Sequence, residues 1–336
     1  MLQCLNLEGK TDLNILLTSV GRRVSLVKFF KEALNGKGYV YSADYDPTAP
    51  GLFLADKSFL VPKVTAKDYI PFLIDKCKKE NIKLIIPLID PELPIIAKAR
   101  NIFLENGITP LISNYETVMI GYDKLLTAKF FNENHIQSPN TSLFKEDTSL
   151  SIGKFPIIMK PRFGSASIGV QKCTSIDDVK FYATKISEPI LQTFLMGNEI
   201  TVDVLTDFEG RPLSIVQRKR LKVRAGEVER GITIKNEELF KLVLKIVEKL
   251  KPFGAINIQC FLTPKGFFFT EINTRFGGGY PLSQYAGVNF PKKIILLLED
   301  IKTQTSIYDY EEGLLMLRYD EAIYIKNDQL LSKELL

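Results

Sequence analysis

Polar and apolar side chains alternate in the segment FFFTEINTRFGGG, residues 267–279, which otherwise has the composition of a buried strand. Successive side chains of a strand point to opposite faces, so Glu271, Asn273 and Arg275 are expected on one face. The preceding apolar strand is joined to this one by the turn TPKG, which predicts an antiparallel pair with Gln259 on the same face. Carboxylate and amide oxygens suit Mg²⁺, which takes further ligands from water and phosphates. By itself the alternation favours an edge strand with one solvated face over a magnesium and phosphate platform, and the rest of the chain decides between the two.

A glycine- and serine-rich loop upstream has the composition of a phosphate-binding loop. The segment FPIIMKPRFGSASIGVQKC, residues 155–173, predicts a strand, a flexible loop and a second strand, with Lys160 on the first strand. Backbone N–H groups of such a loop can fold over phosphates, and the lysine adds a compact positive charge beneath them. It is not a Walker A loop, because no G-K-[ST] follows and no helix starts there. Alone the signal is weak, since many hairpins contain Gly-Ser turns.

The next hairpin has features that suit a nucleoside. The segment EPILQTFLMGNEITVDVLTD, residues 188–207, predicts two strands joined by a short turn through Gly197. Extended backbone beside an apolar surface suits an adenine ring, and the carboxylate of Glu199 could accept both ribose hydroxyls. Any β-hairpin would give the same pattern, so this segment carries weight only in combination with the others.

The first 120 residues alternate short apolar runs with amphipathic helical patterns, which predicts a parallel sheet with helices on both faces. Polar residues at strand carboxyl ends then collect along one edge, where open α/β sheets bind ligands; these are Asp44 with Asp46, and Asp90 with Glu92. The expected strands are residues 13–19, 38–44, 82–90 and 108–113, and the expected helices are 22–34, 66–81 and 92–107.

The turn after the first strand, TSVGRRVSL, has one glycine where a dinucleotide-binding turn needs three, which disfavours a Rossmann dehydrogenase. Arg22 and Arg23 could hold an anion at the start of the following helix, or could simply be solvated.

From about residue 140 the pattern changes to strands with glycine-containing turns and two helices, at 176–186 and 236–250, which indicates a separate α+β region. The tail, residues 301–336, is expected to form a hairpin and a polar end. A basic cluster in residues 217–231 could be a solvated hairpin face, an anion-facing loop or a nucleic-acid patch; it contains Arg218, Lys219, Arg220, Lys222 and Arg224. The lack of interleaved aromatic residues disfavours the nucleic-acid patch.

Composition narrows the function classes. With 336 residues, 45% hydrophobic and 25% charged, the chain has the composition of a globular protein of two or three domains. No apolar run approaches the ~20 residues that cross a bilayer and no secretory signal opens the chain, so we expect a cytoplasmic protein without a membrane partner. A net charge of +5 demands no nucleic acid. Four scattered cysteines and the single His135 disfavour a disulfide framework, a zinc site and a Ser-His-Asp triad.

In this order and spacing the motifs resemble those of the ATP-grasp superfamily, most closely one synthetase unit of the carbamoyl-phosphate synthetase large subunit. The resemblance covers residues 13 to 300 and includes the pair Asp123 and Lys124 that opens a linking helix. It implies an ATP-grasp fold of class α/β and α+β. A parallel-sheet pre-ATP-grasp domain would span 1–120, two subdomains that sandwich ATP would span 121–196 and 197–300, and a C-terminal hairpin and tail would span 301–336.

The same resemblance implies roles for individual residues. Lys160 and Arg275 would be catalytic, with Arg275 on the transferred phosphoryl group or an acyl-phosphate oxygen, and Gln259, Glu271 and Asn273 would bind one or two Mg²⁺ ions, for which Mn²⁺ could substitute. ATP would contact Lys124, Lys160, Gly164, Ser165, Ala166, Ser167, Gly169, Gln192, Thr193, Phe194, Leu195 and Glu199.

The implied reaction is that of a ligase, which phosphorylates a substrate carboxylate with ATP and transfers the acyl group to an amine or similar nucleophile. The chain contains one synthetase unit, so carbamoyl-phosphate synthesis itself is not implied, and Gln192 stands where the family often has Glu. Alternatives are an ATP-binding regulator without turnover and an ATP-grasp kinase that stops at a phosphorylated product. The partners would be small molecules, with a homodimer possible. Substrates are expected near Arg22, Arg23, Asp44, Asp90, Glu92, Lys222 and Arg224, while Gly277–Gly279 could approach substrate or turn the chain.

Overall fold

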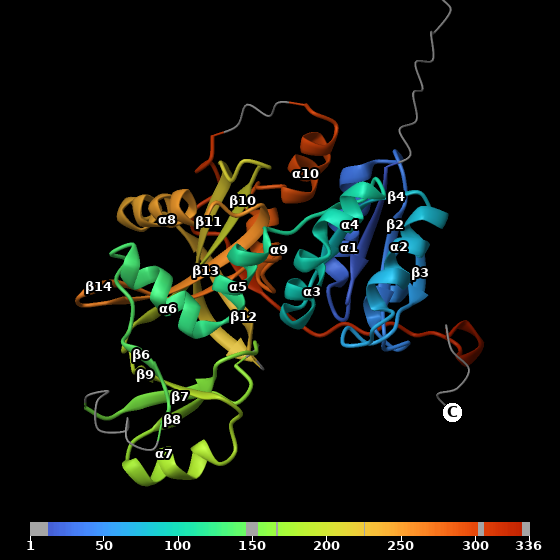
Figure 1. The fold of residues 1–336 in the computed structure, drawn as a ribbon. Coiled ribbons are helices and arrows are strands. Elements are labelled where there is room, and N and C mark those ends of the chain that lie inside the picture. Colours follow the sequence, from blue (N-terminus) through green and yellow to red (C-terminus); the bar gives the residue numbers. More distant parts are fainter. Residues whose placement is uncertain (1–12, 146–153, 166, 225, 302–305, 331–336) are drawn as a thin grey trace, which may run out of the picture. The chain divides into compact units, whose positions relative to one another are not determined.

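The structure is a computed structural model, which describes residues 13–145, 154–165, 167–224, 226–301 and 306–330 (Figure 1). The chain divides into two compact units. Within the described ranges, unit 1 contains the residues up to Leu88, Ala99–Leu111, and the residues from Ile323 onward. Unit 2 contains Ile89–Lys98 and Ile112–Ala322. Ala166, one of the predicted ATP contacts, and Cys4, one of the four cysteines, lie outside the described residues.

Unit 1 is built on a parallel sheet with the strand order β3-β2-β1-β4-β5. Its strands are β1 (Asn14–Thr18), β2 (Val40–Asp44), β3 (Lys57–Leu60), β4 (Ile82–Pro87) and β5 (Thr109–Pro110), and its helices are α1 (Val24–Leu34), α2 (Tyr69–Lys79) and α4 (Arg100–Glu105), with short 3₁₀ turns η1 (Pro50–Phe53) and η4 (Asn327–Gln329). All residues of β1 and β2 are buried, as expected for central strands of a parallel sheet. The predicted parallel sheet is therefore confirmed.

Two details of unit 1 differ from the sequence-based expectation. The edge strand β3 was not expected, because its sequence KSFL is short and only partly buried, so it lacks the apolar run of a central strand. The single helix expected over residues 92–107 is interrupted at Ala99. Its first half belongs to unit 2 and its second half, α4, to unit 1.

Unit 2 contains two antiparallel sheets. The larger has the order β14-β13-β10-β11-β12-β15, and the smaller has the order β6-β9-β7-β8. The larger sheet consists of β10 (Asn198–Thr206), β11 (Pro212–Arg224), β12 (Glu227–Ile234), β13 (Gly254–Thr263), β14 (Gly266–Asn273) and β15 (Leu315–Leu317), and the smaller of β6 (Thr141–Leu143), β7 (Ile157–Pro161), β8 (Gln171–Cys173) and β9 (Pro189–Thr193). The helical elements are η2 (Asp90–Glu92), α3 (Leu93–Lys98), α5 (Tyr115–Tyr122), α6 (Lys124–Glu133), α7 (Ile176–Ala183), α8 (Glu237–Leu250), α9 (Tyr280–Tyr285) and α10 (Phe290–Leu298).

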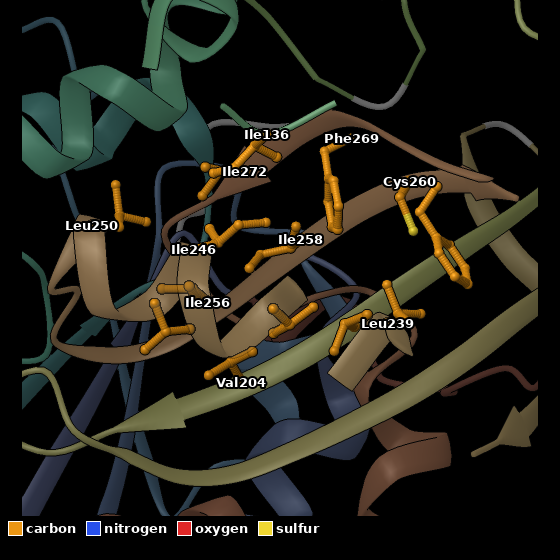
Figure 2. Close-up of a cluster of buried hydrophobic side chains, with 14 of the residues drawn as sticks. Ile136, Val204, Leu239, Ile246, Leu250, Ile256, Ile258, Cys260, Phe269 and Ile272 are labelled. Atoms are coloured by element: carbon orange, nitrogen blue, oxygen red, sulfur yellow. The ribbon is translucent and has the colours of Figure 1, made fainter. Parts of the chain in front are cut away.

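The main core of unit 2 lies on one face of the larger sheet, where α8 supplies an apolar stripe (Figure 2). Leu239, Val243, Ile246 and Leu250 are spaced three or four residues apart and are all buried, which is the period of one helix face. The side chain of Asn236 caps the helix by accepting a hydrogen bond from Leu239 N at 2.9 Å. Strands β10, β13 and β14 face this stripe with residues such as Val204, Ile258 and Phe269. Their alternate positions are therefore free to carry polar residues on the opposite face.

A β-bulge in β14 decides which side chains face that core. Gln259 pairs with Glu271 and the next residue, Cys260, pairs with Phe269, so Thr270 is an extra residue in the strand. The bulge lets Phe269 and Ile272 both face the core, although they are three residues apart. Glu271 and Asn273 consequently point away from the core.

The described residues of the C-terminal segment contain no hairpin of the expected kind. They contribute one strand, β15, which pairs with β12 at the edge of the larger sheet. The prediction was wrong because the apolar residues Leu315 to Leu317 find their partner in an earlier strand rather than in the tail itself. Among the residues that the structure describes, no helix has the length and apolar character that a membrane crossing requires.

Candidate functional site

The larger sheet presents rows of polar residues on the face opposite α8. One row runs through register partners on four strands, and a second row lies beside it. The first row is Arg218, Thr201, Gln259 and Glu271, and the second includes Asp203, Asn257 and Asn273. The sequence predicted Gln259 beside Glu271, and the register pairs these two residues directly.

An ion pair joins this polar face to the smaller sheet. Lys160, on β7, places its Nζ 3.2 Å from Oε1 of Glu271, and the lysine side chain is only 6% exposed. Burial acts to raise the pKa of Glu271, but the ammonium groups of Lys160 and Lys124 outweigh it and hold that pKa below its ordinary value. Glu271 is therefore an ionised carboxylate among cations, which suits it to metal or phosphate chemistry.

A pocket of unit 2 opens beside this ion pair. It is lined by Asp90, Gly121, Tyr122, Lys124, Thr127, Gly164, Glu271, Ile272 and Asn273. The Nζ of Lys124 donates to the carbonyl oxygen of Gly164 at 2.7 Å, so the lysine at the start of α6 contacts the predicted phosphate loop. The pocket therefore brings together residues that lie far apart in the sequence, including the predicted ATP contacts Lys124 and Gly164 and the predicted metal ligands Glu271 and Asn273.

Asp123 and Arg162 hold the elements of this pocket together. The side chain of Asp123 caps α6 by accepting from Leu125 N at 2.9 Å. The same carboxylate receives two hydrogen bonds from Arg162, from Nε at 2.9 Å and from Nη2 at 2.6 Å. This bidentate pair ties the start of α6 to the end of β7. Arg162 was not predicted as a site residue, because the local sequence K-P-R does not indicate that its arginine pairs with Asp123.

Arg275 is held at the edge of the pocket by Asp90. Its Nη2 lies 2.6 Å from Asp90 Oδ2, and both side chains are 11% exposed. Its Nη1 donates to the carbonyl oxygen of Phe276 at 3.1 Å. The sequence named both Arg275 and Asp90 as site residues, but their contact spans 185 positions and no local pattern indicates it.

The predicted nucleoside hairpin lies on β9 and β10. Gln192 is buried, and its Nε2 donates a hydrogen bond to Thr141 Oγ1 at 2.9 Å. Glu199 forms an ion pair with Arg220 of the basic cluster. Burial raises the pKa of Glu199, and the guanidinium of Arg220 opposes this shift without cancelling it. The adenine and ribose roles of this hairpin stay predictions.

The basic cluster is part of the β11–β12 hairpin, yet not all of it is solvated. Arg218 is buried and pairs with Asp203, and Arg220 has a side chain that is 8% exposed. The predicted substrate residues Lys222 and Arg224 pair with Glu229 at 2.8 and 3.6 Å, respectively. They do not line the pocket described above, and their substrate roles stay predictions.

The remaining predicted substrate residues have different surroundings. Arg22, Arg23 and Asp44 belong to unit 1, where Asp44 accepts hydrogen bonds from Gly21 N at 2.8 Å and Asp46 N at 3.0 Å. Asp44 therefore fixes the turn that follows β1. Glu92 belongs to unit 2 and is fully buried.

Close packing explains why glycines follow Arg275 in the sequence. A Cβ on Gly279 would lie 2.3 Å from Arg218 Nη1, and a Cβ on Gly277 would lie 3.1 Å from Asp203 Oδ1. The turn thus passes directly over the buried Asp203–Arg218 pair, where a side chain would not fit.

The pKa of Lys124 gives a testable pH dependence. Burial lowers this pKa from the ordinary value of 10.5, and Glu271 opposes the shift only in part. If Lys124 binds phosphate as an ammonium, ATP affinity should weaken as the pH rises through this lowered pKa, before an ordinary lysine would titrate. Titrating ATP at increasing pH measures this, and Lys124→Arg should keep its affinity over the same range because arginine stays charged. A parallel loss of affinity in both proteins would contradict the prediction.

Comparison with known proteins identifies the fold family. A family described as "PylC-like, N-terminal domain" matches residues 15–111. A second family, "ATP-grasp in the biosynthetic pathway with Ter operon", matches residues 185–319, which include the hairpin of Glu199, the strands of the predicted metal ligands and the glycine turn. These matches agree with the resemblance to the ATP-grasp superfamily. The resemblance and the fold class expected from the sequence are confirmed.

The relatives of this chain include ligases and carboxylases. A carbamoyl-phosphate synthase of Methanobrevibacter smithii is 29% identical over 266 residues, which are 72% of this chain and 69% of the relative. A D-alanine–D-alanine ligase of Thermotoga sp. strain RQ2 is 29% identical over 205 residues, 54% of this chain and 67% of the relative. Both relatives are named for synthase or ligase activities.

Solved structures share the ATP-grasp fold at low sequence identity. A biotin carboxylase from Campylobacter jejuni matches with a TM-score of 0.72 at 15% identity, over 88% of this chain and 73% of that one. An L-amino acid ligase from Bacillus licheniformis matches with a TM-score of 0.67 at 19% identity, over 86% and 74%. An N5-carboxyaminoimidazole ribonucleotide synthetase from Thermotoga maritima matches with a TM-score of 0.64 at 20% identity, over 87% and 77%.

Proposed function

We propose that this ATP-grasp ligase uses ATP and Mg²⁺ to phosphorylate a substrate carboxylate and then transfers the acyl group to an amine. The observation that carries the proposal is the pocket beside the Lys160–Glu271 pair. There two lysines, a carboxylate and an amide adjoin a glycine-containing loop, and Arg275 lies within hydrogen-bonding reach of the pocket residue Asp90. A nucleoside triphosphate with its metal requires cations that bind its phosphates and an ionised carboxylate that binds the metal.

The reaction proceeds by two displacements. An oxygen of the substrate carboxylate attacks the γ-phosphorus, an oxygen–phosphorus bond forms, and the bond between the γ-phosphorus and the bridging oxygen breaks to release ADP. An amine then attacks the acyl carbon, inorganic phosphate leaves, and the nitrogen loses a proton to solvent. No protein nucleophile takes part, so the chain needs no Ser-His or Cys-His pair.

The chain's own residues act by position and charge. Lys160 and Lys124 bind phosphate oxygens, and Arg275 binds an oxygen of the transferred phosphoryl group or of the acyl phosphate. These cations offset the negative charge that gathers around the γ-phosphorus, and their buried setting makes each interaction stronger than it would be in water. The Asp123–Arg162 pair holds Lys124 and β7 in place for this purpose.

The polar face of the larger sheet fits Mg²⁺. The Nδ2 of Asn273 donates a hydrogen bond to Asn257 Oδ1 at 3.1 Å. The amide oxygen of Asn273 is therefore on the side of Arg275, 3.5 Å from the Nη2 of that arginine. Among the described residues, no group of three or more His, Cys, Asp or Glu side chains could hold a metal ion. Gln259, Glu271 and Asn273 would therefore hold Mg²⁺ with one carboxylate and two amide oxygens, and phosphate and water would complete the shell. When bound, Mg²⁺ supplies charge neutralisation at the phosphates.

The proposal is tested by substrate-dependent ADP release. The protein is mixed with ATP, Mg²⁺ and members of a carboxylate panel, with hydroxylamine as a general nitrogen acceptor. At least one carboxylate should raise the rate of ADP release well above the rate with ATP alone and yield its hydroxamate. Tight ATP binding without stimulation by any carboxylate would instead favour an ATP-binding regulator. ADP formation with a stable phosphorylated product and no hydroxamate would favour a kinase.

A further inference from the structure

The pocket contains two carboxylates with different partners. Glu271 is paired with Lys160 and belongs to the proposed metal and phosphate side. Asp90 is paired with Arg275, and it lines the pocket from η2, 185 positions before Arg275 in the sequence. The partner of Asp90 is thus a guanidinium that is proposed to bind substrate, and not one of the lysines that are proposed to bind phosphate. Asp90 therefore lies on the substrate side of the pocket, where its negative charge can attract a cationic group of a ligand.

The Asp90–Arg275 pair presents a cation and an anion side by side. The contact is short, at 2.6 Å, and both side chains are 11% exposed, so water screens the two charges only weakly. The ligand that complements such a pair carries a carboxylate for the guanidinium and, close beside it, an ammonium for the aspartate. An α-amino acid in its zwitterionic form has this arrangement.

Arg275 has the capacity to take a ligand in addition to Asp90. Its Nε is buried and has no hydrogen-bond partner among the described residues, while its two Nη atoms are engaged by Asp90 and the carbonyl oxygen of Phe276. A movement that brings Nε to a substrate oxygen loses no hydrogen bond at that atom. Asp90 can then keep its position and receive the ammonium group.

We propose that the carboxylate substrate of this enzyme is an amino acid, whose carboxylate binds Arg275 and whose ammonium binds Asp90. This inference rests on the function proposed above and names its substrate class. Asp90 would determine specificity without touching the phosphoryl group. It would also hold the substrate nitrogen in its protonated form, in which it has no lone pair to attack the acyl phosphate, so that the acyl group passes to the second substrate.

The experiment compares amino acids with analogues that lack one charge. ADP release is measured with ATP, Mg²⁺ and hydroxylamine for each of the twenty common L-amino acids, and then for the deaminated acid and the decarboxylated amine of each active one. The deaminated acid should have a kcat/KM at least about 10-fold lower, and the amine should be inactive. In Asp90→Asn the KM for the amino acid should rise at least about 10-fold, and the preference for the amino acid over the deaminated acid, measured as the ratio of their kcat/KM values, should fall at least about 10-fold.

A matched control separates specificity from general damage. Asp207 is another aspartate that is paired with an arginine, Arg211. It directly follows the last residue of β10, whereas Glu199 lies at the start of that strand. Asp207→Asn should leave the ratio between amino acid and deaminated acid unchanged. A merely structural role of Asp90 would lower the rates with both substrates equally, since it would displace Arg275 in both cases, and that result would overturn the inference.

Other outcomes distinguish this inference from the proposed function. If carboxylates without an ammonium group support ADP release as well as amino acids do, the substrate class is wrong and the ligase chemistry stands. If neither the amino acids nor any other member of the carboxylate panel supports ADP release, both the substrate class and the proposed function are overturned.

Discussion

Replacing Glu271 by glutamine is expected to reduce substrate-dependent ADP release by on the order of 100-fold or more. The substitution keeps the size of the side chain but removes the charge that faces Lys160 at 3.2 Å and that is proposed to bind Mg²⁺. The concentration of Mg²⁺ needed for half-maximal rate should rise at the same time. Steady-state rates measured across a Mg²⁺ titration give both quantities.

Glu209→Gln is the matched control for this prediction. Glu209 pairs with Arg211, and both side chains are 68% exposed, so solvent already screens this pair. Its loss should leave the rate and the Mg²⁺ dependence unchanged. An active Glu271→Gln enzyme with normal Mg²⁺ dependence would remove Glu271 from the metal and phosphate site.

Replacing Asp203 by alanine is expected to destabilise unit 2 by about 3–5 kcal/mol. Asp203 receives two hydrogen bonds from Arg218, at 2.7 and 2.8 Å, and a third from Ser283 Oγ at 2.6 Å. Arg218 is 1% exposed, so removing Asp203 leaves a buried guanidinium without its counter-ion. Thermal unfolding should show a decrease in Tm on the order of 10 °C.

Two further variants test the cause of that loss. The double variant Asp203→Leu with Arg218→Met replaces both charges by apolar groups and should recover most of the stability, because no unpaired charge remains. Glu133 forms an exposed ion pair with Lys129, and the two side chains are 63% and 66% exposed, respectively. Glu133→Ala removes this pair and should change the unfolding free energy by less than about 1 kcal/mol. A double variant as unstable as Asp203→Ala would show that the ion pair is not the source of the effect.

The sequence predicted the parts of the site that depend on local pattern. Alternation along residues 267–275 and the TPKG turn placed Gln259 opposite Glu271, and the register shows this pairing. These features were accessible because strand periodicity and hairpin turns act over a few residues. The regular alternation in the first 120 residues similarly gave the parallel sheet of unit 1.

The remaining contacts depend on distant segments. Nothing in the run QRKRLKVR indicates that Arg218 is buried, because the burial depends on Asp203 of the neighbouring strand and on the close passage of Gly279. The Asp90–Arg275 contact likewise depends on how an early turn and a late strand meet. The bulge at Thr270 follows from packing of Phe269 and Ile272 against the core, which sequence alternation alone would not reveal.

The most direct test of the proposed acyl-phosphate chemistry follows oxygen from the substrate to the phosphate. A carboxylate that supports ADP release is labelled with ¹⁸O in both oxygens and turned over with ATP, Mg²⁺ and hydroxylamine. Because a carboxylate oxygen forms the bond to the γ-phosphorus, we predict one ¹⁸O atom in each inorganic phosphate released, detectable by mass spectrometry. Inorganic phosphate without label, or the appearance of AMP and pyrophosphate in place of ADP, would contradict carboxylate activation by phosphorylation.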